Sequence, residues 1–161
     1  MKSSWVLNAS PLIALSKSNL LKTISPLAKT WIIPEGVINE LSIKSPIQPV
    51  LSQLATDAEV ITRSIKKIDH IVSDWNLGLG ESEVLSLALS DGNGVVIDDL
   101  QARKCAKVLE ITISGSLGLI LMAKRDGIIK NVRPAFKSLI QSGLYIDPKL
   151  IENILESIKE E

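Results

Sequence analysis

A continuous run of β-branched residues, Val95-Val96-Ile97, constrains the fold of this chain more than any other feature. The run follows an Asp-Gly-Asn-Gly turn cluster at positions 91–94 and ends at Asp98-Asp99. A short, wholly apolar stretch between turn signals is typical of a strand that is buried on both faces. Strands of this kind belong to parallel sheets, because helices cover both sides of such sheets.

Three further short apolar stretches have the same character, at residues 5–7, 31–33 and 111–113. Helical signals follow the first two, with Ser10 as a helix cap before Pro11 and with a helix opening at Pro34. Further helices are expected over about 81–90, 100–109, 116–125, 131–142 and 149–159. Val60-Ile61-Thr62 could be a strand or continue a helix. Strands that alternate with helices predict right-handed βαβ units and a central parallel sheet of about four strands.

The chain has 161 residues, a length that suits one domain with a sizeable core. We therefore expect a single domain over 1–161, in which the helix at about 149–159 closes the core or forms an interface. Cys105 and His70 are the sole residues of their kinds, which excludes a disulfide framework and a zinc-finger site. Aromatic residues make up 3%, too few to stack successive bases of a nucleic acid.

The charges sum to zero but are unevenly distributed, since 18 basic residues balance 18 acidic ones. Residues 68–102 hold seven acids and no Lys or Arg, whereas residues 103–137 hold eight bases and two acids. This pattern fits either two solvated faces or an acidic pocket beside a basic track. No apolar run reaches about 20 residues, so we expect no membrane segment and a cytoplasmic protein.

Polar residues follow the predicted strands at the points where the strands end. Asn8 ends the first strand, Asp98 and Asp99 end the third, and Ser116 lies just beyond the fourth. Functional groups of parallel sheets gather at the carboxyl ends of the strands. Two adjacent carboxylates there suit a hard divalent cation, and either one could instead cap the helix that starts near Leu100.

Acids also lie on the predicted helices. Glu81 opens a helix and shares a face with apolar residues, while Glu83 falls on a face that we interpret as a solvent-exposed rim. Glu40 lies at the edge of another apolar face. A half-buried carboxylate is costly unless it is paired or bound to metal, so these acids favour a metal pocket.

At this point the sequence resembles the PIN-domain family, which includes the VapC-type toxins. The resemblance covers most of the chain and rests on five motifs in order, of which each is weak alone. It is closest to a branch of that family that opens with Asn-Ala-Ser-Pro-Leu. The motifs are Asn8-Ala9-Ser10-Pro11-Leu12-Ile13, Pro34-Glu35-Gly36-Val37-Ile38-Asn39-Glu40-Leu41, Gly80-Glu81-Ser82-Glu83, Val95-Val96-Ile97-Asp98-Asp99 and Gly115-Ser116-Leu117-Gly118.

The resemblance implies a three-layer α/β/α sandwich and a metal-dependent endoribonuclease that hydrolyses single-stranded RNA, as the toxin of a toxin–antitoxin pair. It implies Mg²⁺ or Mn²⁺ as cofactor, an antitoxin protein as partner and a homodimer. By the same resemblance the metal ligands are Asn8, Glu40, Glu81 and Asp99. Asp98 is the adjacent catalytic candidate, and Ser10 and Ser116 would support the ligands with their hydroxyls.

One position departs from the family pattern, because Asn8 stands where the family usually has Asp. An amide oxygen can still bind Mg²⁺ but brings no charge, and we hypothesise that Asp98 restores it. The alternative function is a weak or inactive PIN-like module that binds RNA or protein. Arg103, Lys104 and Lys107 are expected to bind flanking phosphates, unless they form a solvated helix face.

Overall fold

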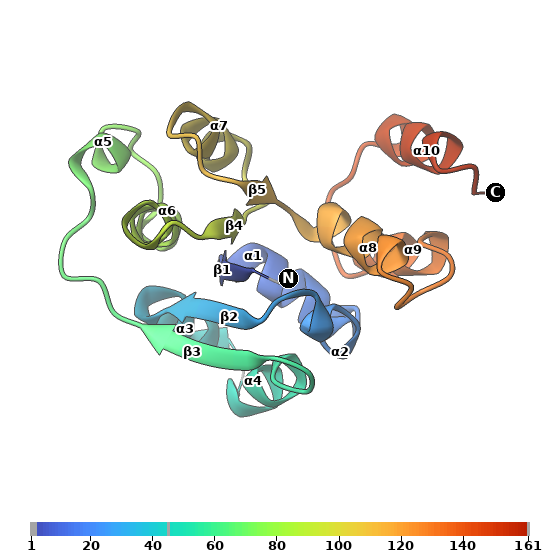
Figure 1. Cartoon of the computed structure of the whole chain (residues 1–161), viewed down its shortest axis with the longest axis horizontal. Helices are drawn as coiled ribbons and strands as arrows, with labels where there is room; N and C mark the ends of the chain where they lie inside the picture. Colours follow the sequence, from blue (N-terminus) through green and yellow to red (C-terminus); the bar gives the residue numbers. More distant parts are fainter. Residues whose placement is uncertain (1–2, 45, 161) are drawn as a thin grey trace.

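The computed structural model describes residues 3–44 and 46–160 and is built around one all-parallel sheet (Figure 1). The strands are β1 (Ser4–Leu7), β2 (Thr30–Pro34), β3 (Glu59–Arg63), β4 (Gly94–Val96) and β5 (Ile113–Ser114). Their order across the sheet is β3-β2-β1-β4-β5, and every neighbouring pair is parallel. Val95 and Val96 of the continuous apolar run therefore lie in an interior strand, as its composition predicts, and Ile97 directly follows that strand.

Helices connect successive strands and cover both faces of the sheet, which gives the three-layer arrangement (Figure 1). The segments between β1 and β3 are α1 (Ala9–Lys17), α2 (Leu21–Ile24), the 3-10 turn η1 (Ser25–Leu27), α3 (Glu35–Lys44) and α4 (Gln48–Leu54). Those between β3 and β5 are α5 (His70–Ser73), α6 (Leu79–Asp91) and α7 (Leu100–Val108). The chain ends with α8 (Ser116–Arg125), α9 (Arg133–Gln141) and α10 (Pro148–Ser157).

The strand order reverses between β1 and β4. The chain first steps from β1 outward to β3, then crosses back through α6 to place β4 on the other side of β1. Such a reversal opens a crevice at the carboxyl ends of the two central strands, where open α/β sheets bind ligands. The backbone N–H of Asn8 bonds to the carbonyl of Val96 at 3.1 Å, which fixes the two strand ends side by side.

The sheet has five strands rather than about four, because 59–63 forms β3. This edge strand pairs in register with β2 from Thr30↔Glu59 to Pro34↔Arg63. The exposed residues at its ends interrupt the apolar pattern. The sequence alone therefore did not distinguish a strand from a helix at residues 60–62. The β5 strand begins later than predicted, since the Ile111 N–H bonds to the Ala106 carbonyl at 2.9 Å and closes the end of α7.

The first helix also begins earlier than predicted. Asn8 occupies the cap position of α1, so Ser10 and Pro11 lie within its first turn and Ser10 is not the cap. The Asn8 side chain forms no capping hydrogen bond. The carboxyl end of β1 therefore passes directly into a helix, with the amide of Asn8 left available at the crevice.

The apolar core fills the space between sheet and helices, with Trp31 and Phe136 among its largest fully buried side chains. Ile151 and Leu155 of α10 are buried against this core. Cys105 is fully buried in α7, as its apolar neighbours predict. Within the described residues, no helix combines the length and apolar character needed to cross a bilayer.

Candidate active site

Asn8 is a buried polar residue at the crevice, with 2% of its surface exposed. Among residues 3–44 and 46–160, its side-chain amide has no hydrogen-bond partner. No buried side-chain nitrogen or oxygen atom among these residues lacks a partner, so the polar atoms of this amide still reach solvent. The amide therefore lies where an external ligand would find an unused oxygen.

Glu40 faces Asn8 across a gap that Gly80 leaves open. A β-carbon placed on Gly80 would lie 3.5 Å from Oε2 of Glu40 and 3.6 Å from Oδ1 of Asn8. Two oxygens from separate elements thus point at one small space beside the first turn of α6. Glu40 is exposed, not half-buried as the sequence suggested, because its side chain opens toward the crevice and not toward the core.

Glu81 and Glu83 have different surroundings although they are two residues apart on α6. One carboxylate oxygen of Glu83 accepts the backbone N–H of Gly36 at 3.0 Å, so Glu83 holds the start of α3. This corrects its interpretation as a solvent-exposed rim residue. The Glu81 carboxylate turns back toward Gly78, where an added β-carbon would lie 2.6 Å from its Oε2. Glu81 is thus the freer of the two to serve a ligand.

Asp98 and Asp99 serve two different helices. Asp98 accepts the backbone N–H of Ser116 at 2.8 Å and its hydroxyl at 2.6 Å, at the first residue of α8. Gly115, the cap residue of that helix, has no side chain to fill this role. Asp99 caps α7 by accepting the N–H of Ala102 at 2.9 Å. The prediction that one of these acids caps the helix near Leu100 is therefore confirmed for Asp99, whereas Asp98 binds the start of α8. Asp99 keeps one carboxylate oxygen for another ligand.

Four of the seven acids in residues 68–102 accept hydrogen bonds at helix starts. Asp69 accepts the N–H groups of Ile71 and Val72 in α5, so four helices, α3, α5, α7 and α8, begin against a carboxylate from residues 68–102. Carboxylates are favourable there because the unpaired N–H groups carry partial positive charge. The sequence indicated local caps. It gave no signal that Glu83 and Asp98 reach helices distant in the chain.

The remaining predicted residues divide into contacts and exposed groups. Ser116 touches Asp98, whereas Ser10 is exposed on α1. Arg103 is half-buried and donates from Nη1 to the carbonyl of Ile97 at 2.8 Å, while Lys104 and Lys107 are exposed. The structure thus places one of the three bases at the crevice.

The available donors are amide and carboxylate oxygens, the chemistry that Mg²⁺ and Mn²⁺ prefer. Asn8 and Glu40 already face one gap. Across residues 3–44 and 46–160, no three His, Cys, Asp or Glu side chains lie together closely enough to hold a metal ion. These oxygen donors fit a hard cation, and the assignment of Glu81 and Asp99 as further ligands stays a prediction.

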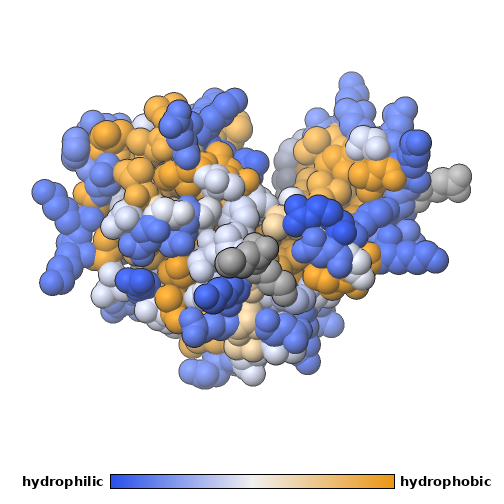
Figure 2. All heavy atoms as spheres, in the orientation of Figure 1, coloured by the Kyte–Doolittle hydropathy of each residue, from blue (hydrophilic) through white to orange (hydrophobic). Residues whose placement is uncertain are grey.

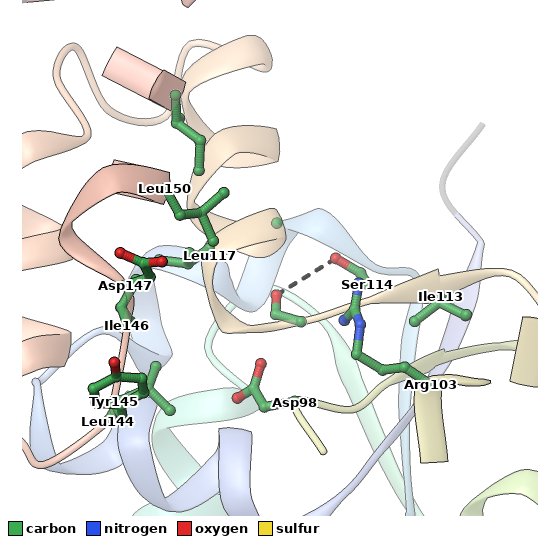
Figure 3. Close-up of a pocket in the computed structure, with 13 residues that line it drawn as sticks. Asp98, Arg103, Ile113, Ser114, Leu117, Leu144, Tyr145, Ile146, Asp147 and Leu150 are labelled. Atoms are coloured by element: carbon green, nitrogen blue, oxygen red, sulfur yellow. Dashed lines mark hydrogen bonds between the residues drawn. The ribbon is translucent and has the colours of Figure 1, made fainter. Parts of the chain in front are cut away.

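A cleft of about 450 Å³ adjoins this site on the side of β5 (Figure 3). Asp98 and Arg103 form one wall, and the segment 144–147 forms the opposite wall. Figure 2 shows a notch in the molecular outline at this place, between the part that contains α7 and the part that contains α10. Asp98 belongs to both the strand-end site and the cleft.

A parallel sheet with acids and an unpartnered amide at its switch point defines a doubly wound α/β protein with a candidate site for a hard cation. The chain belongs to the PIN-domain family, because the family model DUF3368, described as a PIN domain, matches residues 4–160. This family is nuclease-like, and its members generally depend on divalent metal ions. The resemblance noted in the sequence is therefore confirmed.

Two solved structures share the fold. A PilT N-terminus domain protein, SSO1118 from the hyperthermophilic archaeon Sulfolobus solfataricus P2, is similar over 74% of this chain and 92% of its own, with a TM-score of 0.55 at 19% identity. PAE2754 from Pyrobaculum aerophilum is similar over 75% of this chain and 90% of its own, with a TM-score of 0.51 at 16% identity. No curated protein matches the sequence.

Proposed function

We propose that this protein is a metal-dependent endoribonuclease that hydrolyses phosphodiester bonds in single-stranded RNA. The observation that carries the proposal is the unpartnered Asn8 amide facing the Glu40 carboxylate at the switch point of a PIN-domain sheet. In this proposal Asn8, Glu40, Glu81 and Asp99 hold Mg²⁺ or Mn²⁺. The ion would polarise the phosphoryl oxygen and lower the pKa of the attacking water.

The protein's own residues then have distinct tasks. Asn8 and Glu40 orient oxygens toward the gap at Gly80 before any ligand arrives. Ser116 fixes the direction of the Asp98 carboxylate through two hydrogen bonds. Asp98 would therefore add negative charge beside the site from a fixed position. Arg103 presents unused guanidinium N–H groups at the cleft, where they suit a phosphate next to the scissile one.

A second candidate function is a PIN-like module that binds RNA or protein without cutting it. The neutral Asn8 favours it, and so do the hydrogen bonds that already occupy Asp98 and Asp99. The two candidates differ in whether the site binds a cation at all. The partners implied by the family, an antitoxin protein and a second copy of the chain, are part of the first proposal.

The test is a calorimetric titration with Mn²⁺ and Mg²⁺ of the native chain and of Asp99→Asn. Asn caps helices about as well as Asp, so the variant removes charge but keeps α7 intact. We expect native binding and a loss of affinity of about tenfold or more in the variant, which corresponds to about 1.4 kcal/mol. Cleavage of single-stranded RNA with Mn²⁺ should fall in parallel.

Gly80→Ala tests the same site by filling the gap and not by removing charge. Its methyl group would enter the gap between Asn8 and Glu40 at ordinary contact distance, while Ala is favoured over Gly in helices. We expect weaker metal binding with no loss of thermal stability. Ser90→Ala, at an exposed position of the same helix, is the control and should bind as the native chain does. Folded protein that binds no metal at millimolar concentration would refute the nuclease and leave the binding module.

A further inference from the structure

We infer that the cleft between β5 and the segment 144–147 binds one unpaired nucleotide of the RNA, with its base against Tyr145 and its phosphate on Arg103. The inference rests on the proposed function, because it names the part of the substrate that lies beside the cleaved bond. Asp98 links the two places, since it lines the cleft and follows the strand that ends at the candidate metal site.

The size and lining of the cleft suit a nucleotide. Its volume of about 450 Å³ is within the range of about 300–1,000 Å³ that small-molecule sites occupy. Leu117, Leu144 and Ile146 give it an apolar side, and Asp98 and Arg103 give it a polar side (Figure 3). This division matches a flat base joined to an anionic phosphate.

Tyr145 is the aromatic group at the rim. It is 89% exposed and lies in the irregular segment between α9 and α10. A tyrosine that covers no core offers a flat face at which a base can stack, and such stacking is tolerant of base identity. The low aromatic content of the chain fits one stacked base and not a platform for several.

The polar side holds one cation and two carboxylates, each with a defined partner. Arg103 donates one N–H to the carbonyl of Ile97, and its other guanidinium N–H groups have no partner among the described residues. Asp98 is held by Ser116, and Asp147 caps α10 through the N–H of Lys149 at 2.9 Å. Arginine binds phosphate with paired N–H groups, and carboxylates accept from the amino groups of bases.

The test measures RNA binding without cleavage. Fluorescence anisotropy of a labelled single-stranded RNA octamer, in EDTA, would compare the native chain with Tyr145→Ala, Tyr145→Phe and Arg103→Gln. We expect Tyr145→Ala to weaken binding about tenfold or more, and Tyr145→Phe to stay within about twofold, because the ring is kept. Arg103→Gln should weaken binding and lower its salt dependence. Val108→Ala, at a 66% exposed apolar position of α7 outside the cleft, should bind as the native chain does.

Either of two results would overturn the inference: no RNA binding by the folded native chain, or equal binding by native chain and Tyr145→Ala. Equal binding would leave the cleft to a protein partner. Cleavage with Mn²⁺, measured separately, tells the two proposals apart. Cleavage that persists in Tyr145→Ala with unchanged KM removes the nucleotide site and keeps the nuclease, whereas Tyr145-dependent binding without cleavage removes the nuclease alone. Circular dichroism and melting curves would verify that each variant is folded.

Discussion

At the scale of single residues, the neutral amide of Asn8 affects both the stability of the empty site and its affinity for a metal ion. An amide tolerates burial without an ion better than a carboxylate does, because a buried charge without a partner is strongly disfavoured. Its amide makes no side-chain hydrogen bond among the described residues but still reaches solvent, although 2% of the residue is exposed, and this suits a site that is stable when empty. The same neutrality weakens the hold on a divalent ion.

Asn8→Asp should reverse this balance. In EDTA we expect the variant to melt several degrees below the native chain, because a buried carboxylate is then unpaired. With Mn²⁺ its affinity should exceed the native value by about tenfold, and the melting temperature should recover. Differential scanning fluorimetry with and without the ion measures both. An equal melting temperature in EDTA, or no gain in affinity, would contradict the assignment of Asn8 to the metal site.

The sequence identifies candidate residues for the site, but it does not predict the directions of their side chains. Strand ends and helix spacing identify Asn8, Glu81 and Asp98 as candidates, because both patterns depend on local geometry. Glu83 shows the limit of that reasoning. Its partner is the N–H of Gly36, 47 residues away, and no local pattern encodes a contact of that range.

At the scale of elements, Glu160 ties three C-terminal helices together. The side chain, which lies just beyond α10 and is 6% exposed, accepts the Lys124 ammonium at the end of α8 at 2.7 Å. It also accepts the N–H groups of Val132 and Arg133, at 3.0 and 2.8 Å, at the start of α9. Burial raises the pKa of this carboxyl, but the Lys124 and backbone hydrogen bonds outweigh burial and lower the pKa below its ordinary value of 4.5.

This shift predicts a loss of stability in acid. A carboxyl whose pKa is lower in the folded state stabilises the fold at pH values above its unfolded pKa, and that contribution disappears as pH falls through the folded value. We therefore expect the native melting temperature to drop more steeply than that of Glu160→Gln between about pH 5 and about pH 3. Parallel slopes would show that Glu160 is not responsible. Glu156→Gln, an exposed site on α10, is the control.

Element types were predicted more accurately than element ends. The helices at 100–108, 116–125, 133–141 and 148–157 agree with the expected ranges to within a few residues. The sequence left residues 60–62 open between strand and helix, and pairing with β2 makes them part of β3. The late start of β5 has a local cause, because the turn that closes α7 occupies the residues before it.

At the scale of the whole molecule, Cys105 reports on the integrity of the core. Burial raises the pKa of its thiol, and the charge of Asp69 raises it further, so the reactive thiolate is scarce in the folded protein. We expect a thiol reagent at pH 8 to modify Cys105 slowly in native protein and at once in denaturant. A Ser90→Cys variant, with its added thiol on the surface, is the positive control. Fast native labelling of Cys105 would show that α7 opens locally.

The parallel character of the sheet followed from the sequence, because parallel strands carry a strong apolar signal. The alternation of strands and helices, with right-handed connections, leaves few topologies to choose from. The reversal between β1 and β4 has no such signal. It depends on which side of β1 the fourth strand joins, and in the folded chain α6, which leads to β4, packs against β1, β2 and β4.

The carboxylates that hold the starts of α3, α5, α7 and α8 have a consequence for how such a protein changes over evolutionary time. Their bonds are made inside the chain and are present whether or not a cation is bound. A substitution at Glu40, which is exposed, would remove a proposed ligand and leave all four helix starts in place. Descendants of this chain could thus lose or regain the proposed catalytic activity through single substitutions, while the fold stayed the same.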